Sequence, residues 1–118
     1  MNVQRSDVVL VDFPYPTGQG SKVRPALVIQ NDKDNVRLLN TILAQITGTT
    51  QRAVEATQVL IELNTPDGRQ AGIQFDSVVN CVNVVTVDKG RVLRRIGSLS
   101  QARMRDVDAA LKAALDLP

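Results

Sequence analysis

Histidine and tryptophan are absent from this 118-residue chain, and cysteine occurs once, at Cys81. Without histidine, an enzyme of this sequence has no imidazole for proton transfer or metal binding near neutral pH. A single cysteine forms no internal disulfide, and without histidine it makes neither a zinc site nor a Cys–His nucleophile. Catalysis must therefore rest on arginine, lysine, carboxylate, hydroxyl or backbone groups. We expect neither a metal nor another cofactor.

Long apolar runs and a phosphate-binding glycine loop are missing as well. No stretch reaches the roughly 18 apolar residues of a membrane-spanning helix. The first residues, "MNVQRSDVV", lack the apolar core and cleavage site of a signal peptide, and the lone cysteine fits a reducing compartment. The segment "TGQGSKVRP" does not have the spacing of a P-loop. We expect a cytoplasmic protein with no membrane contact.

Hydrophobic residues make up 43% of the chain but aromatic residues only 3%, which predicts an aliphatic core. The length suits one core, and we expect a single domain over residues 1–118. The net charge is only +2, yet residues 89–105 contain no carboxylate. The cations of this basic run are Lys89, Arg91, Arg94, Arg95, Arg103 and Arg105. The run is either a solvated face, a surface for RNA phosphates, or a surface for acidic residues of a protein partner.

Apolar periodicity predicts short strands followed by one helix. The expected strands are 8–13, 24–30, 38–47, 59–63, 77–87 and 94–98. Ser100 is a suitable N-cap for a helix. The apolar face of that helix is predicted to comprise Met104, Val107, Leu111, Ala114 and Leu115. The pattern predicts a mainly β fold, a strongly bent antiparallel sheet or partial barrel with the C-terminal helix packed on it.

The segment "KVRPALVIQND", residues 22–32, carries the most informative polar groups. Pro25 biases Arg24 toward an extended backbone, and the guanidinium offers a planar fork that fits phosphate oxygens. Gln30 and Asn31 close the strand with amides that are able to bind base edges or backbone. The alternative is that Arg24 caps the strand and pairs with Asp32 or Asp34.

Four segments, in this order, resemble the MazF/PemK toxins of bacterial type II toxin–antitoxin systems. They are "SDVVLVDFP", "KVRPALVIQND", "LAQIT" and "SVVNCVNVVTVDKGRVLRRIGSLS". The resemblance covers about residues 5–115 and implies an SH3-like barrel of the CcdB/MazF type, working as a homodimer. It implies metal-independent, sequence-selective cleavage of single-stranded RNA, an mRNA interferase activity that leaves 2′,3′-cyclic phosphate and 5′-hydroxyl ends and inhibits translation and growth. It also implies a cognate antitoxin protein that blocks the RNA groove, with DNA contacted only through that complex.

The resemblance places the catalytic pair on Arg24 and Thr47. Cleavage by the 2′-hydroxyl requires stabilisation of a crowded, anionic phosphorane. Arg24 suits this electrostatic role, whereas a guanidinium that stays protonated is a poor base. Thr47 is expected to donate its hydroxyl hydrogen bond to a non-bridging oxygen, although on pattern alone it is an ordinary strand residue.

Two loops, "PYPTGQGSK" and "GTTQRAVEAT", are expected to select the substrate, because single-stranded RNA is read through stacking and amide contacts. The predicted substrate-binding residues are Tyr15, Gln19, Gly20, Lys22, Gln30, Asn31, Gly48, Thr49, Gln51, Arg52 and Ser77. Tyr15 has the alternative of packing on its own prolines, and Ser77 of forming a turn after Asp76. The first loop lacks the acidic residue often present there in the family, so no loop carboxylate is expected to act in acid–base catalysis.

Two other functions remain open at this level. A CcdB-like toxin of the same fold binds DNA gyrase and performs no chemistry, but "VRPALVIQND" and "QIT" speak against it. An inactive SH3-like binding module is not excluded by the sequence.

Overall fold

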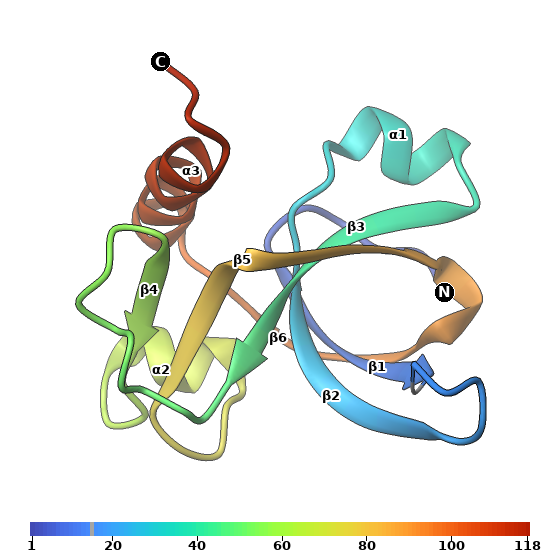
Figure 1. Ribbon diagram of the computed structural model, residues 1–118, viewed down its shortest axis with the longest axis horizontal. Helices are drawn as coiled ribbons and strands as arrows, with labels where there is room; N and C mark the ends of the chain where they lie inside the picture. The colour runs from blue at the N-terminus through green and yellow to red at the C-terminus, as the bar shows by residue number, and fades with distance from the viewer. Residues whose placement is uncertain (15) are drawn as a thin grey trace.

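The computed structural model describes residues 1–14 and 16–118, and within them a six-stranded antiparallel sheet carries three α-helices (Figure 1). The elements are β1 (Asp7–Pro14), β2 (Ser21–Val28), α1 (Asp32–Arg37), β3 (Asn40–Thr47), β4 (Gln58–Ile61), α2 (Pro66–Ala71), β5 (Ser77–Asp88), the 3-10 helix η1 (Lys89–Arg91), β6 (Val92–Ser98) and α3 (Gln101–Leu115). The strand order is β4-β5-β3-β2-β1-β6. No helix in the described ranges is both long and apolar enough to cross a membrane.

The central strands are buried on both faces, which explains their uninterrupted apolar runs. Val8 and Leu27 belong to a core shared with α3, whereas their neighbours Val9 and Val28 belong to a second core inside the curved part of the sheet. All four side chains are fully inaccessible. Because successive side chains point to opposite faces of a strand, a strand between two cores must be apolar at every position.

The sheet bends where β5 changes its pairing. Ala44 pairs with Val84, but the next residue of β3, Gln45, pairs with Asn80, so residues 81–83 form a bulge in β5. A bulge of this kind bends its strand and increases the local twist. The two halves of β5 therefore face different cores, and the sheet curls into a partial barrel with α3 against its outer side (Figure 1). The predicted mainly β fold with a C-terminal helix is confirmed.

Helix α3 begins as predicted, but its apolar face ends earlier. The Ser100 side chain accepts a hydrogen bond from the backbone N–H of Arg103 and caps the helix. Met104 and Val107 are buried, as expected. Leu115, predicted to lie on the apolar face, is 62% exposed and does not belong to the core. The end of the chain from Leu115 onward is exposed.

Helix α2, which the periodicity did not predict, positions the segment that precedes β5. Thr65 caps it by accepting a hydrogen bond from the N–H of Gly68, and Pro66 occupies the first turn. Gly72 ends the helix in the left-handed conformation, where a Cβ atom would overlap the carbonyl of Ile96 in β6. This close approach holds the C-terminal end of α2 beside β6.

Candidate active site

Strands β2 and β3 separate at one end, and the opening between them forms the site. Their pairing covers Ala26–Val28 against Leu43–Gln45 and goes no further. Beyond it, Arg24 stays paired with β1 and Thr47 with β5. Pro25, at the point of separation, has no N–H to offer either neighbour. The fork leaves Arg24 and Thr47 on opposite sides of a gap in the sheet.

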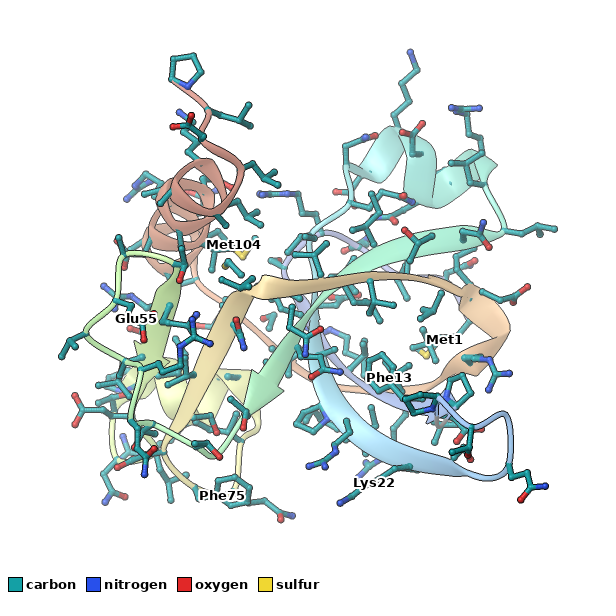
Figure 2. All side chains as sticks on the ribbon, in the orientation of Figure 1. Met1, Phe13, Lys22, Glu55, Phe75 and Met104 are labelled. Carbon is teal, nitrogen blue, oxygen red and sulfur yellow. The ribbon has the colours of Figure 1, made fainter. Side chains whose placement is uncertain are left out.

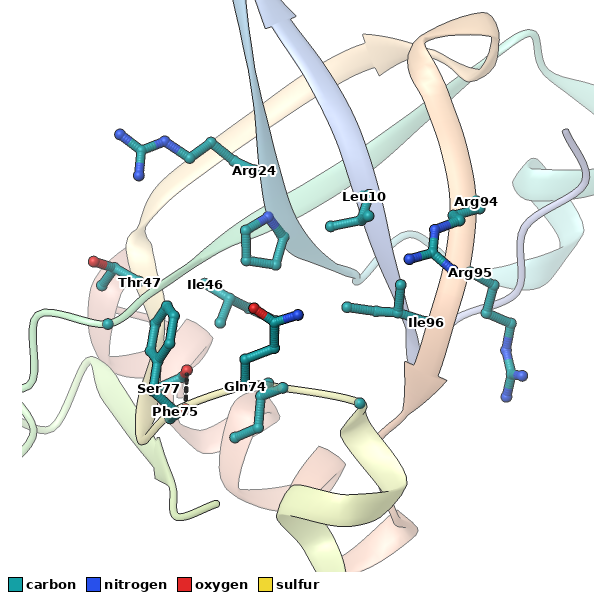
Figure 3. A pocket seen from close by; sticks show the side chains of 14 residues that line it. Leu10, Arg24, Ile46, Thr47, Gln74, Phe75, Ser77, Arg94, Arg95 and Ile96 are labelled. Carbon is teal, nitrogen blue, oxygen red and sulfur yellow. Dashed lines mark hydrogen bonds between the residues drawn. The ribbon is translucent and has the colours of Figure 1, made fainter.

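A groove of about 520 Å³ occupies the fork (Figure 3). Arg24 on β2 and Thr47 on β3 line it at the fork, and Arg94 on β6 lines the wall across from them (Figure 3). A second hollow, of about 260 Å³, lies beside Phe13 and Lys22 and shares Arg24 and Thr47 with the first. Arg24 and Thr47 thus line both hollows.

The Arg24 guanidinium is exposed and has neither a hydrogen bond nor an ion pair with any residue that the structure describes. The alternative in which it pairs with Asp32 or Asp34 is wrong. Asp32 instead accepts hydrogen bonds from the backbone of Arg5 and the side chain of Asn35. The pKa of Asp34 is lowered by a hydrogen bond from Asn31 and then by one from Arg37. The guanidinium is therefore available to an anion.

The Thr47 hydroxyl is oriented by the chain that follows it. Its Oγ1 accepts a hydrogen bond of 3.1 Å from the backbone N–H of Thr49. Because a hydroxyl has two acceptor positions and one proton, this bond leaves the proton free to donate. A donor fixed in this way can meet an oxygen of a bound phosphate without first reorganising.

The described charged residues that line the groove are all positive. Neither hollow is lined by a carboxylate among the described residues. Arg95 lines the groove while its Nε donates to Asp7 at 2.9 Å, and Arg94 has no ion pair within the described ranges. The rest of the basic run points elsewhere: Arg103, for example, pairs with Asp106 at 2.8 Å. A cationic groove next to an oriented hydroxyl is suited to a polyanionic strand.

Five residues predicted from the sequence line these hollows: Arg24, Thr47, Lys22, Gly48 and Ser77. Ser77 is 2% exposed and its Oγ donates to the carbonyl of Phe75 at 2.8 Å. The turn-forming alternative for Ser77 is therefore realised, at the edge of the groove.

Gln30 and Asn31 do not reach the groove, contrary to expectation. The Gln30 side chain is 6% exposed and donates to Oδ1 of Asn35 and to the carbonyl of Asn40. Asn31 caps α1 by accepting a hydrogen bond from the N–H of Asp34. Both amides serve the fold at the opposite end of β2.

The remaining predicted contacts lie on loops outside the groove walls. Gln19, Gly20, Thr49 and Gln51 are exposed. Arg52 forms a bidentate pair with Glu55, and this hydrogen bonding raises the pKa of Arg52 and lowers that of Glu55. Tyr15 lies outside the described residues. Their contacts with substrate remain predictions.

The sequence analysis missed the wall formed by residues 72–75, which lines the groove together with Ile96. Phe75 is 56% exposed and projects from the edge of the molecule near the end of β3 (Figure 2). An aromatic residue in the polar segment "GIQFDS" was the signal available in the sequence.

Comparison with known proteins identifies the class to which this groove and half-barrel belong. The family model described as "PemK-like, MazF-like toxin of type II toxin-antitoxin system" matches residues 4–115. Endoribonuclease EndoA of Bacillus subtilis is 37% identical over 118 residues, covering 99% of this chain and 97% of that protein. Endoribonuclease MazF6 of Mycobacterium tuberculosis is 35% identical over 119 residues, covering 99% and 100%.

Solved structures also match the fold of this chain. The Mycobacterium tuberculosis toxin MazF-mt6 matches with a TM-score of 0.74 and 25% identity, covering 93% of this chain and 98% of that one. A mycobacterial endoribonuclease in complex with its cognate antitoxin matches with a TM-score of 0.76 and 24% identity, covering 98% and 97%. The chain belongs to the PemK-like, MazF-like toxin family. The resemblance seen in the sequence is confirmed, and neither a gyrase-binding toxin nor an inactive barrel is favoured.

Proposed function

We propose that this protein is the toxin of a type II toxin–antitoxin system and acts as a metal-independent endoribonuclease on single-stranded RNA, with Arg24 and Thr47 as its catalytic pair. The observation that carries the proposal is that both residues, one with an unpaired guanidinium and the other with an oriented hydroxyl, line one groove, which no described carboxylate lines. The family's curated relatives bear the name endoribonuclease.

The reaction is an attack of the ribose 2′-oxygen on the adjacent phosphorus. The 2′-oxygen loses its proton and forms the new P–O bond, the bond to the 5′-oxygen breaks, and that oxygen gains a proton. The products are a 2′,3′-cyclic phosphate and a 5′-hydroxyl. Arg24 stabilises the charge that develops on the non-bridging oxygens, and Thr47 donates a hydrogen bond to one of them.

Positioning of the RNA in the groove provides the second contribution to the rate of cleavage. The two hollows that Arg24 and Thr47 line suit the nucleotides that flank the scissile phosphate. Holding the 2′-hydroxyl in line with the leaving oxygen removes much of the entropic barrier. The chemistry therefore needs no imidazole, in agreement with a chain that has none.

Two protein partners accompany this function. One is a cognate antitoxin, as in the mycobacterial endoribonuclease solved in complex with its own; acidic residues of such a partner suit the cationic groove. The other is a second copy of the chain, forming a homodimer. The cytoplasm, where messenger RNA is translated, is the proposed location, and DNA is contacted only through the antitoxin complex.

The test is cleavage of a long unstructured RNA by purified protein in EDTA. Wild-type protein is expected to give discrete fragments that end in a cyclic phosphate. Arg24→Ala is expected to lower the rate by about 10²- to 10³-fold, because it removes a charged donor from the transition state. Its thermal midpoint should stay unchanged, since the side chain is exposed and has no polar partner among the residues that the structure describes.

The matched control is Arg105→Ala, which removes an exposed arginine from α3 away from the groove and should cleave like wild type. RNA that stays intact while folded wild-type protein still arrests growth would contradict the proposal and favour gyrase binding. Equal cleavage by wild type and Arg24→Ala would remove Arg24 from the mechanism.

A further inference from the structure

Phe75 is an exposed aromatic side chain that lines the groove. The chain has two phenylalanines and one tyrosine, and Phe75 leaves 56% of its surface accessible while lining the groove. Leaving an aromatic ring in water forgoes the free energy of its burial. A ring kept exposed beside Thr47 and Gly48 is thus available to a ligand in the groove.

The ring is held in place from several directions. It lies against Gly48, where a Cβ atom would overlap its Cε2 atom, so glycine makes room for the ring. Ser77 Oγ donates to the carbonyl of Phe75 at 2.8 Å. Oδ1 of the next residue, Asp76, accepts a hydrogen bond of 2.8 Å from the N–H of Leu63. The turn that carries the ring is therefore tied both to itself and to the segment after β4.

Gln74 supplies an amide next to the ring. Its side chain lines the same groove and makes no hydrogen bond within the described part of the chain. Figure 3 shows its amide pointing into the groove, with Phe75 on one side and Ile96 on the other. An amide both donates and accepts, as the edge of a nucleobase does.

We propose that Phe75 and Gln74 form a nucleobase site adjacent to the scissile phosphate: an unpaired base stacks on the Phe75 ring and presents its edge to the Gln74 amide. Arg24 and Arg94 flank this site and neutralise the phosphates that a bound strand brings. Stacking on aromatic rings and hydrogen bonding to amides are the means by which proteins read single-stranded RNA. The inference rests on the proposed function, because it takes RNA as the ligand.

The absence of tryptophan allows a direct binding test. Phe75→Trp introduces the only tryptophan of the protein at the proposed platform. The probe is a random-sequence oligoribonucleotide pool, 2′-O-methylated throughout so that the 2′-oxygen cannot attack. Saturable quenching of tryptophan fluorescence is expected with this pool but not with an abasic strand of equal length. The control is Val36→Trp, on α1 and 85% exposed, whose fluorescence should not change.

Cleavage kinetics test the same site without a new fluorophore. Phe75→Leu keeps an apolar side chain against Gly48 but removes the π face, and should lower kcat/KM by about 10- to 100-fold, mainly through KM, since stacking of one base contributes about that much. Phe75→Tyr should restore wild-type cleavage. Gln74→Met should change the base preference at one position next to the cut, as read by sequencing fragment ends.

The outcomes separate this inference from the proposed function. If wild-type protein does not cleave RNA, the proposed function fails whatever happens at Phe75. If wild type cleaves and both Phe75→Leu and Gln74→Met match it in kcat/KM and in cleavage sites, only the nucleobase site is overturned. Quenching of the Phe75→Trp variant by concentrating the protein alone, with none from the RNA pool, would assign the ring to a contact between two copies and also overturn it.

Discussion

The two ends of the β2–β3 pair differ in how they hold polar groups. At the end near α1, Gln30, Asn35 and Thr41 are at most 6% exposed and bonded to one another. Lys89 adds a bond from its Nζ to the carbonyl of Asn35 at 2.7 Å. At the forked end, Arg24 and Gln74 are exposed and have no polar partner within the described residues. We call these the closed end and the open end.

This difference in burial indicates that the polar groups of the closed end stabilise the fold, whereas those of the open end are free to bind a ligand. A buried polar group must be hydrogen-bonded within the protein, because an unsatisfied one destabilises the fold. An exposed polar group is solvated and can exchange its water for a ligand. The predicted strand 24–30 contains both Arg24 and Gln30, but six residues of nearly extended chain place them about 20 Å apart, and β2 ends at Val28. The unpaired polar groups of the open end are therefore the ones that we expect to bind substrate.

At the open end, Thr47→Val should give the largest effect after that of Arg24→Ala. Valine keeps the shape and strand preference of threonine but cannot donate a hydrogen bond, so kcat should fall by about 10²-fold, the order expected for one lost transition-state donor. The measurement is single-turnover cleavage of RNA, with the thermal midpoint as the check on folding.

Thr47→Ser is the control, since it restores the hydroxyl and should recover most of the rate. A Thr47→Val protein that cleaves like wild type would show that the hydroxyl takes no part, and the comparison between the ends would then rest on Arg24 alone.

At the closed end, Asn35→Ala should have the opposite effect to Thr47→Val: it should lower stability and leave cleavage unchanged. It leaves Thr41 Oγ1 and the carbonyl of Gln30 without their partner, which should lower the free energy of unfolding by about 2–3 kcal/mol. For a domain of this size that corresponds to a drop of about 10 °C in the thermal midpoint. Cleavage measured well below the midpoint should be unchanged.

The matched control is the next residue, Val36, which is 85% exposed; Val36→Ala should shift the midpoint by little. Loss of cleavage in folded Asn35→Ala would show that the closed end also shapes the active groove.

The smallest effect is expected at Cys81, which belongs to neither end. Its side chain is 1% exposed, and burial raises the pKa of the thiol to about 11 from 9.0. The native thiol should react slowly with an aromatic disulfide reagent at about pH 8 and quickly after unfolding. Because the unfolded chain loses this proton first, the free energy of unfolding should decline as the pH rises from 9 to 11.

Denaturant unfolding of wild type and Cys81→Ala over that pH range isolates the contribution of the Cys81 thiol to the pH dependence of stability, since the other groups titrate equally in both proteins. Parallel pH dependences would show that the buried thiol does not control stability there.

The strands and α3 were predictable because their signals are local. Apolar residues within 8–13 and 24–30 predicted two strands, which the structure has at Asp7–Pro14 and Ser21–Val28. Ser100 and the three- and four-residue spacing after it predicted the start of a helix. Helices α1 and α2 were missed because six residues are too few to show a helical period. Capping signals were present, however, at Asn31 and in the Thr65–Pro66 pair.

The groove was only half predictable. Arg24 and Thr47 came from segments that resemble a known family, and the structure places both on the groove. Phe75, Gln74 and Arg94 could not be joined to them, because nothing in the sequence shows that the turn before β5 and the strand β6 meet the fork between β2 and β3. That meeting depends on the strand order β4-β5-β3-β2-β1-β6 and on the bend in β5.

The sequence by itself determined the aliphatic core, the run of strands with a late helix, and a chemistry limited to arginine, hydroxyl and backbone groups, since each follows from residue type and short-range spacing. Tertiary structure alone decided which polar groups are buried and which meet in a groove. The physical reason is that burial and proximity depend on long-range strand pairing, which brings together residues about 50 positions apart, such as Arg24 and Phe75, and separates near neighbours such as Arg24 and Gln30.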